Sequence, residues 1–424
     1  MCPCTGDESS GGLVGTATRR GVRLGRALTV LLTCGTLAGT SLAGAAPAGS
    51  APRSEKIAPG VEYRDVDLRT ARGVVRAHVV TVDLRDRHVR IGLLHPGRVA
   101  ARRTVSQLAD TQGALAGVNG DFFHITEAQH PGVAATGSAV GPEIADGRPL
   151  KAAVPQGQRF GPALPPGTAT GDVLGVGTDR TARIDRLSLS GSVSTPEGPL
   201  NLGGLNQYAL PVGSIGAYTA DWGSVSRARA VCGTDTSRSA PCSKDTYEVT
   251  VTNGRVVATA GKPGSGTIPA GTTVLVGREA GARRLRELTK GQSVRVEHRL
   301  VAASGVSYAF AIGGFPVLRH GAPLKGLDTE ATAVRTAVGI GDGGHRLLLV
   351  ALDGGPAYRG GLTVAELASR LKELGATEGF DLDGGGSSTL VARPRGATRV
   401  SVLNHPSGGA ERAVANGVGV FSAA

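Results

Sequence analysis

The chain has few aromatic residues, and this scarcity excludes one class of binding surface. Phenylalanine, tyrosine and tryptophan together make up 3% of its 424 residues. Stacking platforms for nucleic-acid bases or sugars need several exposed rings in succession. The sequence also has no basic helix and no basic run interleaved with aromatics. We therefore expect no nucleic-acid partner.

Long apolar runs are also missing. An apolar stretch over residues 27–42 is short and rich in Gly and Thr, so no stable membrane insertion is expected. It follows a basic region and precedes small-residue cleavage patterns, which predicts a secretory signal peptide over residues 1–48. The pair Arg19-Arg20 is compatible with twin-arginine export, and residues 32–34 match a lipoprotein box only faintly. We predict a secreted protein, with a lipid-anchored form as the lesser alternative.

Cysteine is equally scarce. Three of the five cysteines lie in the predicted signal peptide, which leaves Cys232 and Cys242. An isolated pair in an exported protein predicts a disulfide. Closing so short a loop stabilises by roughly 2–3 kcal/mol on the chain-entropy account. A zinc site is the alternative, but no histidine lies near in sequence to complete it.

What the chain does contain is glycine and positive charge. Its 66 glycines and scarce helical periodicity predict strands and turns, and hence an α+β fold with mixed, strand-rich sheets and few helices. The net charge of +12 favours anionic partners such as phosphate-bearing polymers or acidic envelope glycans. The composition leaves the oligomeric state open.

The most informative motif follows a short apolar strand near the C-terminus. It combines a carboxylate, three glycines and two hydroxyls: Asp383, Gly384, Gly385, Gly386, Ser387 and Ser388. Successive glycines lose much backbone entropy on folding, and they allow N–H groups to converge on an anionic ligand. A tight connection between strands is the plain alternative. The carboxylate and hydroxyls favour a site.

A second Asp-Gly-Gly motif begins at Asp353. An amphipathic helix over residues 363–375, with a capping box at its start, connects the two motifs. Such a strand–helix–strand unit can bring Asp353 and Asp383 to one edge of a sheet. Arg335 begins the strand antiparallel to the one ending at Asp353, so a simple hairpin predicts that these two side chains are close. An arginine and two carboxylates beside a glycine-rich loop suit phosphate.

These motifs belong to an ordered set that resembles the phosphodiester glycosidase family. The matching segments are Asn119-Gly120-Asp121-Phe122-Phe123, Gly313-Gly314-Phe315-Pro316, Arg335-Thr336-Ala337-Val338-Gly339, Asp353-Gly354, residues 382–388, Arg412 and residues 415–420. The resemblance implies a family domain over residues 114–422, with a β-rich insertion at about residues 172–299. A β-rich segment over residues 51–113 precedes it.

The resemblance implies cleavage of a sugar C1–phosphate bond, as in GlcNAc-1-phosphodiesters or phosphate-linked envelope glycans. A departing phosphomonoester has a pKa of about 6 or below, so a cationic, N–H-rich cradle matters more than a strong general acid. We assign catalysis to Asp383, Asp353 and Arg335, with Asp121 as the alternative second carboxylate and Asn119 orienting sugar hydroxyls. The expected substrate-binding set is Asn119, Gly120, Asp121, Gly384, Gly385, Gly386, Ser387, Ser388, His405 and Arg412.

Two other functions remain open at this point. A metal-dependent phosphodiesterase would cut the P–O bond, with Asp353, Asp383 and Asp121 offering oxygen ligands to Ca²⁺ or Mg²⁺. No spacing matches a known metal loop, so no cofactor is expected. A non-catalytic envelope-glycan-binding protein would use the same pocket without turnover.

Overall fold

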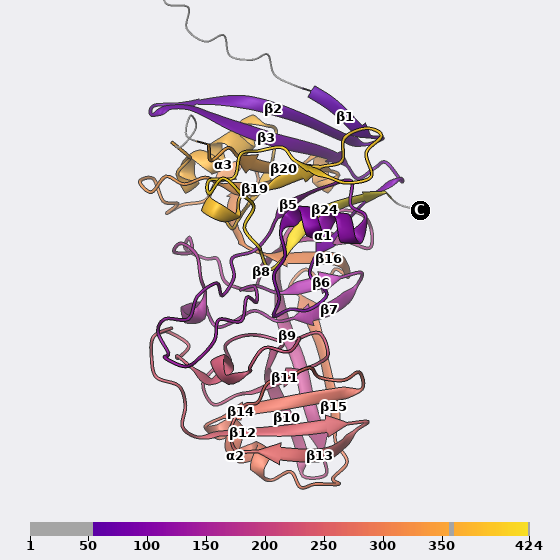
Figure 1. Cartoon of the computed structure of the whole chain (residues 1–424), viewed down its shortest axis with the longest axis vertical. Coiled ribbons are helices and arrows are strands. Elements are labelled where there is room, and N and C mark those ends of the chain that lie inside the picture. Colours follow the sequence, from indigo (N-terminus) through magenta and orange to yellow (C-terminus); the bar gives the residue numbers. More distant parts are fainter. Residues whose placement is uncertain (1–53, 356–359, 423–424) are drawn as a thin grey trace, which may run out of the picture. The chain divides into compact units, whose positions relative to one another are not determined.

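The computed structural model describes residues 54–355 and 360–422, which Figure 1 shows in colour. These described residues belong to one compact unit. The predicted signal peptide, residues 1–48, lies outside the described residues. Within the described ranges, no helix is long and apolar enough to cross a membrane.

The first sheet has eight strands and positions both Asp-Gly-Gly motifs. In spatial order they are β1 (Ser54–Ala58), β2 (Val61–Thr70), β3 (Gly73–Asp83), β20 (Arg346–Leu352), β19 (Thr336–Gly341), β21 (Glu378–Leu382), β17 (Phe315–Arg319) and β18 (Ala322–Pro323). Its neighbouring strands are antiparallel throughout. β19 and β20 join through Asp342-Gly343, as the Asp-Gly pair predicts.

The second sheet has eleven strands and contains most of the predicted β-rich insertion. Its main path is β13 (Arg255–Ala260), β12 (Thr246–Thr252), β14 (Thr272–Arg278), β11 (Ile215–Tyr218), β10 (Gly198–Leu205), β9 (Ala182–Thr195), β8 (Asp172–Gly177), β16 (Tyr308–Gly313), β6 (Glu143–Ala145) and β7 (Arg148–Lys151), with β15 (Arg295–Ala302) paired to β9. β10 and β11 run parallel, so the sheet is mixed.

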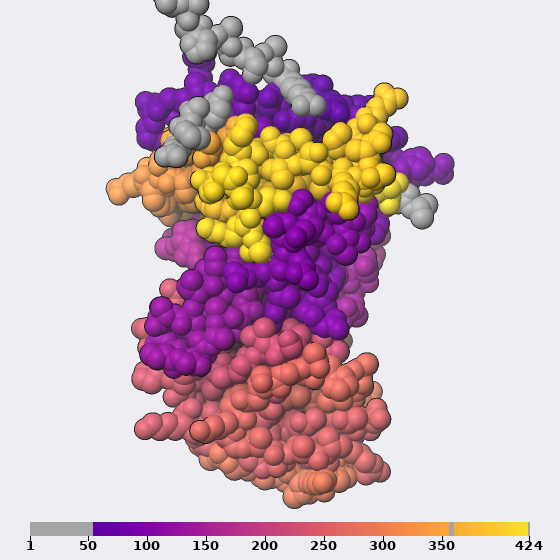
Figure 2. All heavy atoms as spheres, viewed as in Figure 1, coloured from indigo at the N-terminus to yellow at the C-terminus, as the bar shows by residue number. Residues whose placement is uncertain are grey.

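The third sheet brings the C-terminus beside an early strand. Its five strands are β23 (Ser401–Val402), β22 (Leu390–Ala392), β5 (Ala116–Asn119), β24 (Gly417–Ser422) and β4 (Val89–Leu94). Because β24 pairs with both β4 and β5, the yellow C-terminal residues lie against violet N-terminal ones in Figure 2. β22, which follows the Asp383 motif, pairs with β5, and the Asp383 N–H donates to Gly120 O at 2.9 Å, so the motif after β21 meets the one after β5.

Helices are few, as expected for the predicted fold class. They are α1 (Val105–Gln112), α2 (Ala280–Arg286) and α3 (Val364–Glu373), with 3-10 turns η1 (Gln156–Gln158), η2 (Ala228–Val231), η3 (Asp342–Gly344) and η5 (Gly385–Ser387). Thr104 and Thr363 close capping boxes at the starts of α1 and α3, which fixes where each helix begins. The predicted strand-rich α+β fold with few helices is confirmed.

Two large apolar clusters stabilise these layers. The main one packs α3 and strands of the first and third sheets together. A second cluster, including Leu205, Leu275 and Leu285, lies among β9–β14 and α2. The part predicted as an insertion thus has a core of its own, while pairing between β8 and β16 continues its sheet toward the motif-bearing part.

Candidate active site

The two Asp-Gly-Gly motifs lie at the same edge of the first sheet. β20 and β21 both pair antiparallel with β19, so they run in the same direction on either side of it. Asp353 follows β20, and Asp383 follows β21. With one strand between them, two strand spacings separate the chain at these points by on the order of 10 Å.

Arg335 does not pair with Asp353, and this prediction is wrong. Its Nη1 lies 3.8 Å from Oδ2 of Asp381, its Nε donates to Leu362 O at 2.9 Å and its Nη2 donates to Ala331 O at 3.0 Å. The cause is strand alternation, because directly paired residues share a face and the next residue points away. Arg335 lies opposite Leu352, so Asp353 faces the other side.

The Asp383 loop is a tight, partly exposed turn. Ser387 Oγ donates to Asp383 Oδ2 at 2.6 Å, and Arg412 Nη1 lies 3.4 Å from the same hydroxyl. Gly385 has φ of +58°, which favours glycine. A Cβ on Gly386 would lie 2.3 Å from Arg412 Nη2. The glycines therefore let this guanidinium approach the backbone.

Asn119 holds this loop rather than presenting its side chain to a ligand. The residue is fully buried, its Nδ2 donates to Asp383 O at 2.6 Å, and its Oδ1 accepts from Thr336 Oγ1 at 2.9 Å and Thr389 N at 3.0 Å. Both polar atoms of the Asn119 side chain therefore bind protein groups, and its role in orienting sugar hydroxyls stays a prediction. Ser388 Oγ lies 3.0 Å from Thr336 Oγ1 and donates to it, so that hydroxyl faces inward too.

Replacing Asn119 by Ala should lower the free energy of unfolding by about 3 kcal/mol. Three buried hydrogen bonds would be lost, and each loss costs on the order of 1 kcal/mol. Urea denaturation followed by circular dichroism measures the change. The exposed Asn201 of β10 provides a matched control, N201A, with an expected change below about 0.5 kcal/mol. Equal stabilities of the two variants would contradict the assigned role.

Three carboxyl groups near the loop have raised pKa values. Burial raises the pKa of Asp383 to about 6, of Asp121 to about 6 and of Asp381 to about 7. Opposing effects are weaker: the Ser387 hydroxyl lowers the pKa of Asp383, and Arg335 lowers that of Asp381. Both oxygens of Asp381 are buried without a hydrogen-bond partner in the described part of the chain. Such groups can exchange protons near neutral pH.

A buried polar network holds Asp121. Asn416 Oδ1 accepts from the Asp121 N–H at 2.9 Å, and Asp121 Oδ2 accepts from the Gly141 N–H at 2.5 Å. Asn416 Nδ2 in turn donates to Glu143 Oε1 at 2.8 Å. Burial raises the pKa of Glu143 and lowers that of the neighbouring Lys151. Asp121 therefore has a fixed orientation next to the Asp383 loop.

Asp353 belongs to a separate cluster with His78 and His405, on the face of the first sheet opposite to Arg335. Its fully buried carboxylate lies 3.0 Å from His78 Nε2 and accepts from the His405 N–H at 2.6 Å, and His405 Nδ1 lies 3.1 Å away. Tyr63 Oη lies 2.8 Å from His78 Nδ1. Burial alone would raise the pKa of Asp353, but the hydrogen bonds from His78 and His405 lower it on balance. The carboxylate is therefore ionised.

The loop that follows β23 links both clusters. Asn404 Nδ2 donates to Ser388 O at 2.9 Å and to Leu352 O at 3.2 Å. His405 lies next in sequence and lines a cavity of about 710 Å³ with Gly354 and neighbouring loop residues. Arg412, further along the chain, reaches the Asp383 loop.

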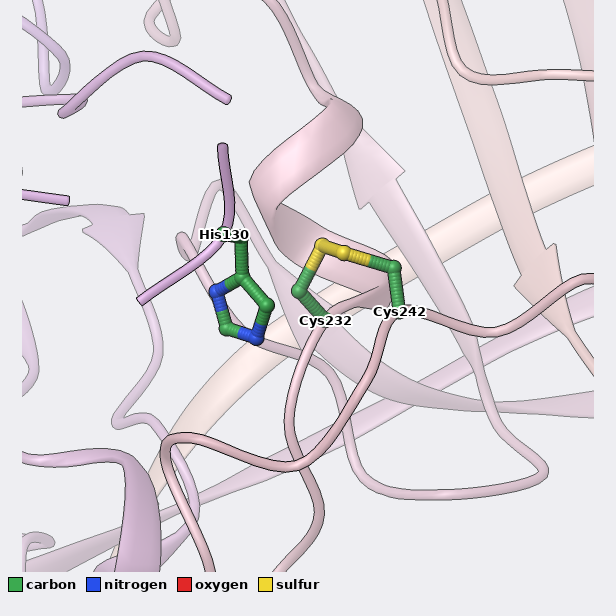
Figure 3. A group of neighbouring side chains, drawn as sticks. All are labelled: His130, Cys232 and Cys242. Atoms are coloured by element: carbon green, nitrogen blue, oxygen red, sulfur yellow. A yellow bond between two sulfur atoms is a disulfide. The ribbon is translucent and has the colours of Figure 1, made fainter. Parts of the chain in front are cut away.

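The carboxylates do not form a compact metal site. Among residues 54–355 and 360–422, one group of three potential ligand atoms lies within 4.8 Å: His130, Cys232 and Cys242. Cys232 and Cys242 form the predicted disulfide, and Figure 3 shows the His130 ring beside it. His130 is far from both cysteines in the sequence, so the sequence alone did not predict this contact. Its two ring nitrogens already contact Glu127 Oε1 and Ala240 O.

Sequence reasoning missed several residues of the site. Asp381 is two residues before Asp383 and shares its face, so the period of a strand could have identified it. His78 sits in a regular β pattern, and Arg159 lies in a loop; neither has a local signal. Arg159 lies near enough for its charge to lower the pKa values of Asp121 and Asp381.

Comparisons with solved structures support the fold. A hypothetical protein from Synechocystis aligns with a TM-score of 0.67 and 19% identity, over 89% of this chain and 64% of that one. This chain thus spans less than two thirds of that protein's length. A protein described as exported, from Burkholderia pseudomallei, aligns with a TM-score of 0.63 and 24% identity, over 82% of this chain and 74% of that one.

A third structure is the zebrafish N-acetylglucosamine-1-phosphodiester alpha-N-acetylglucosaminidase catalytic domain, auto-inhibited by its pro-peptide. It aligns with a TM-score of 0.42 and 15% identity, over 88% of both chains. Comparison with curated proteins finds no match. Residues 245–421 match the sequence model of the phosphodiester glycosidase family, a segment that starts inside the predicted insertion. The resemblance to the phosphodiester glycosidase family is thereby confirmed for residues 245–421.

Proposed function

We propose that this chain is a secreted hydrolase that cleaves the glycosidic C1–O bond of sugar-1-phosphodiesters. The observation that carries the proposal is the Asp383 loop, where a carboxylate of raised pKa lies beside a partly exposed glycine turn and the Arg412 guanidinium. The family match over residues 245–421 supports the same reaction class. Phosphate-linked envelope glycans and GlcNAc-1-phosphodiesters are the proposed substrates.

In the proposed reaction, water adds to C1 of the sugar as the C1–O bond breaks. The bonding electron pair leaves with the phosphate oxygen, and the water proton passes to the Asp383 carboxylate. The products are a free sugar and a phosphomonoester. A leaving group with a pKa of about 6 or below needs little protonation, so its negative charge is the main demand on the site.

The proposed phosphate cradle consists of Arg412 and the N–H group of Gly386, because the N–H groups of Gly385 and Ser387 already donate to Val334 O and Gly384 O. A guanidinium binds phosphate oxygens through paired donors. Arg335, which the sequence assigned to this role, is only 7% exposed and uses its donors on Leu362 and Ala331. We propose that Arg335 instead stabilises the charge of Asp381.

The second carboxyl is proposed to be Asp121 or Asp381, both raised in pKa by burial. Asp353 is proposed as a positioning residue. It holds the ring of His405, whose side chain is 75% exposed, at the mouth of the neighbouring cavity. His405 would there contact the part of the substrate beyond the phosphate.

We propose a reaction without a metal; among residues 54–355 and 360–422, Asp121, Asp353 and Asp383 do not form a group of three close ligand atoms. Secretion is proposed from the predicted signal peptide and is compatible with the disulfide. The basic chain suits an anionic glycan at the envelope. Neither nucleic acid nor a stable membrane insertion is part of the proposal.

An assay on GlcNAc-α-1-phosphate diesters, with and without EDTA, tests this function. Free sugar in both conditions is the expected product. Sugar phosphate, or activity lost in chelator, would favour a metal-dependent phosphodiesterase that cuts P–O. Binding of phosphate-linked glycans without any turnover would indicate the non-catalytic role.

A further inference from the structure

A segment outside the recognised motifs places a guanidinium at the carboxylates. Arg159 follows η1, and its guanidinium carbon lies 5.5 Å from the ring centre of Phe122 and 5.9 Å from that of Phe315. Phe122 follows Asp121 in sequence, and Phe315 pairs with Asp381 between β17 and β21. Arg159 therefore lies next to two of the three carboxyl groups with raised pKa.

The Arg159 side chain has donors to spare. Its Nη1 donates to Pro162 O, whereas Nε and Nη2 make no hydrogen bond within residues 54–355 and 360–422. These two nitrogens are not among the buried polar atoms without a partner, and the residue is partly exposed. Arg335 differs, since its Nε and Nη2 are both used on backbone carbonyls. Arg159 can therefore bind a ligand where Arg335 cannot.

The disulfide-closed loop of the inserted section, residues 233–241, holds this segment in place. Gly157 N donates to Asp235 O at 2.9 Å, Gln158 Nε2 donates to Ser237 O at 3.0 Å, and Arg238 Nη1 donates to Arg159 O at 3.0 Å. The Arg238 guanidinium also lies 4.0 Å from the ring centre of Phe160. Contacts on three successive residues fix the path of the backbone that carries Arg159.

His130, Arg229 and Glu127 form further contacts that hold the disulfide-closed loop and the segment before Arg159. His130 Nε2 lies 2.8 Å from Ala240 O, next to the disulfide shown in Figure 3. Arg229 Nη2 donates to Gln158 Oε1 at 2.8 Å, and its Nε pairs with the buried Glu127. Glu127 thus compensates Arg229, while Arg159 and Arg238 add positive charge on this side. An anion is the ligand that such a surface favours.

We propose that Arg159 binds the phosphate of the glycosyl phosphodiester, and that the Cys232–Cys242 loop positions it. This inference rests on the proposed function and adds a specificity residue contributed by a segment that the inserted section supports. The planar guanidinium matches a phosphate oxygen pair. The Arg159 guanidinium lies beside the Phe122 ring, whereas the Arg412 guanidinium lies beside Gly386 of the glycine turn.

The test measures inorganic phosphate binding to the full chain by calorimetry and, separately, steady-state kinetics on a phosphodiester. R159Q should weaken phosphate binding about 30-fold, the loss of one charged hydrogen-bonding partner. In kinetics KM should rise by a similar factor, with kcat changed less than threefold. R159K should recover part of the affinity, because the charge returns without the paired donors. R295Q, at an exposed arginine of β15, is the matched control and should leave both values unchanged.

R238A tests the positioning role without touching the disulfide. It should weaken phosphate binding about fivefold, because the Arg159 backbone loses its contact, and C232S/C242S should do the same if folded. Unchanged phosphate affinity in R159Q would overturn the inference even if the enzyme turns over phosphodiesters. Unchanged affinity in R238A would overturn the positioning role. If the wild type binds phosphate through Arg159 but hydrolyses no diester, the proposed function fails and the binding site stands.

Discussion

Replacing Asp383 by Asn should lower kcat on a glycosyl phosphodiester by about 10³-fold. The carboxylate takes the water proton in the proposed reaction, and general acid–base groups contribute on the order of 10²–10⁴-fold. The amide keeps the size of the side chain but cannot accept that proton. Turnover of the purified mature chain at saturating substrate measures the effect.

The control for this prediction is D146N. Asp146 is highly exposed, and its φ of +48° suits Asn as well as Asp. Thermal unfolding of both variants should match the wild type within a few degrees, which separates chemistry from folding. Near-normal turnover of D383N with intact folding would remove Asp383 from its central role.

Replacing Asp381 by Asn should stabilise the protein at pH 8 by about 2–4 kcal/mol. Burial raises the pKa of Asp381 from its ordinary value near 3.8 to about 7, and each unit corresponds to about 1.4 kcal/mol. The folded state binds this proton more tightly than the unfolded state. Proton binding to Asp381 therefore stabilises the folded wild type fully below about pH 4, and this contribution is lost as pH rises through 7. At pH 8 the wild type holds a buried charge that the variant lacks.

Urea denaturation at pH 4 and pH 8 measures this prediction. The variant and the wild type should have similar free energies of unfolding at pH 4, where Asp381 is protonated. Asp121 and Asp383 titrate in the same range but are present in both proteins, so the difference isolates Asp381. A variant that is less stable than the wild type at pH 8 would show that the Arg335–Asp381 pair stabilises more than the buried charge costs.

Features set by local chemistry were predictable from sequence. Thr104 and Thr363 have the side chains that cap a helix, and the structure starts α1 and α3 there. Asp342-Gly343 marks the turn between β19 and β20. In each case a few neighbouring residues determine the backbone, so no distant contact was needed.

Partners across the sheet were harder to predict. The sequence places Arg335 and Asp353 at one edge, but which of them share a face depends on a one-residue register that pairing alone decides. In the structure Arg335 lies beside Asp381, and Asp353 contacts His78. Both pairings follow once the register is known.

Contacts between segments that are far apart in the sequence could not be predicted, because no local sequence pattern marks them. Arg159 reaches the carboxylates because the loop at residues 233–241 holds its backbone, and that loop is more than seventy residues away. His130 lies beside the disulfide for a similar reason. The positioning of these side chains depends on how the inserted section packs.

The most direct test of the central claim is hydrolysis of a glycosyl phosphodiester in ¹⁸O-labelled water, with mass analysis of both products. Cleavage of the C1–O bond puts the labelled oxygen on the sugar and leaves the phosphomonoester unlabelled. To avoid exchange at the sugar's open-chain form, products are analysed at short times. We expect label on the sugar alone. Label on the phosphate, with none on the sugar, would contradict it.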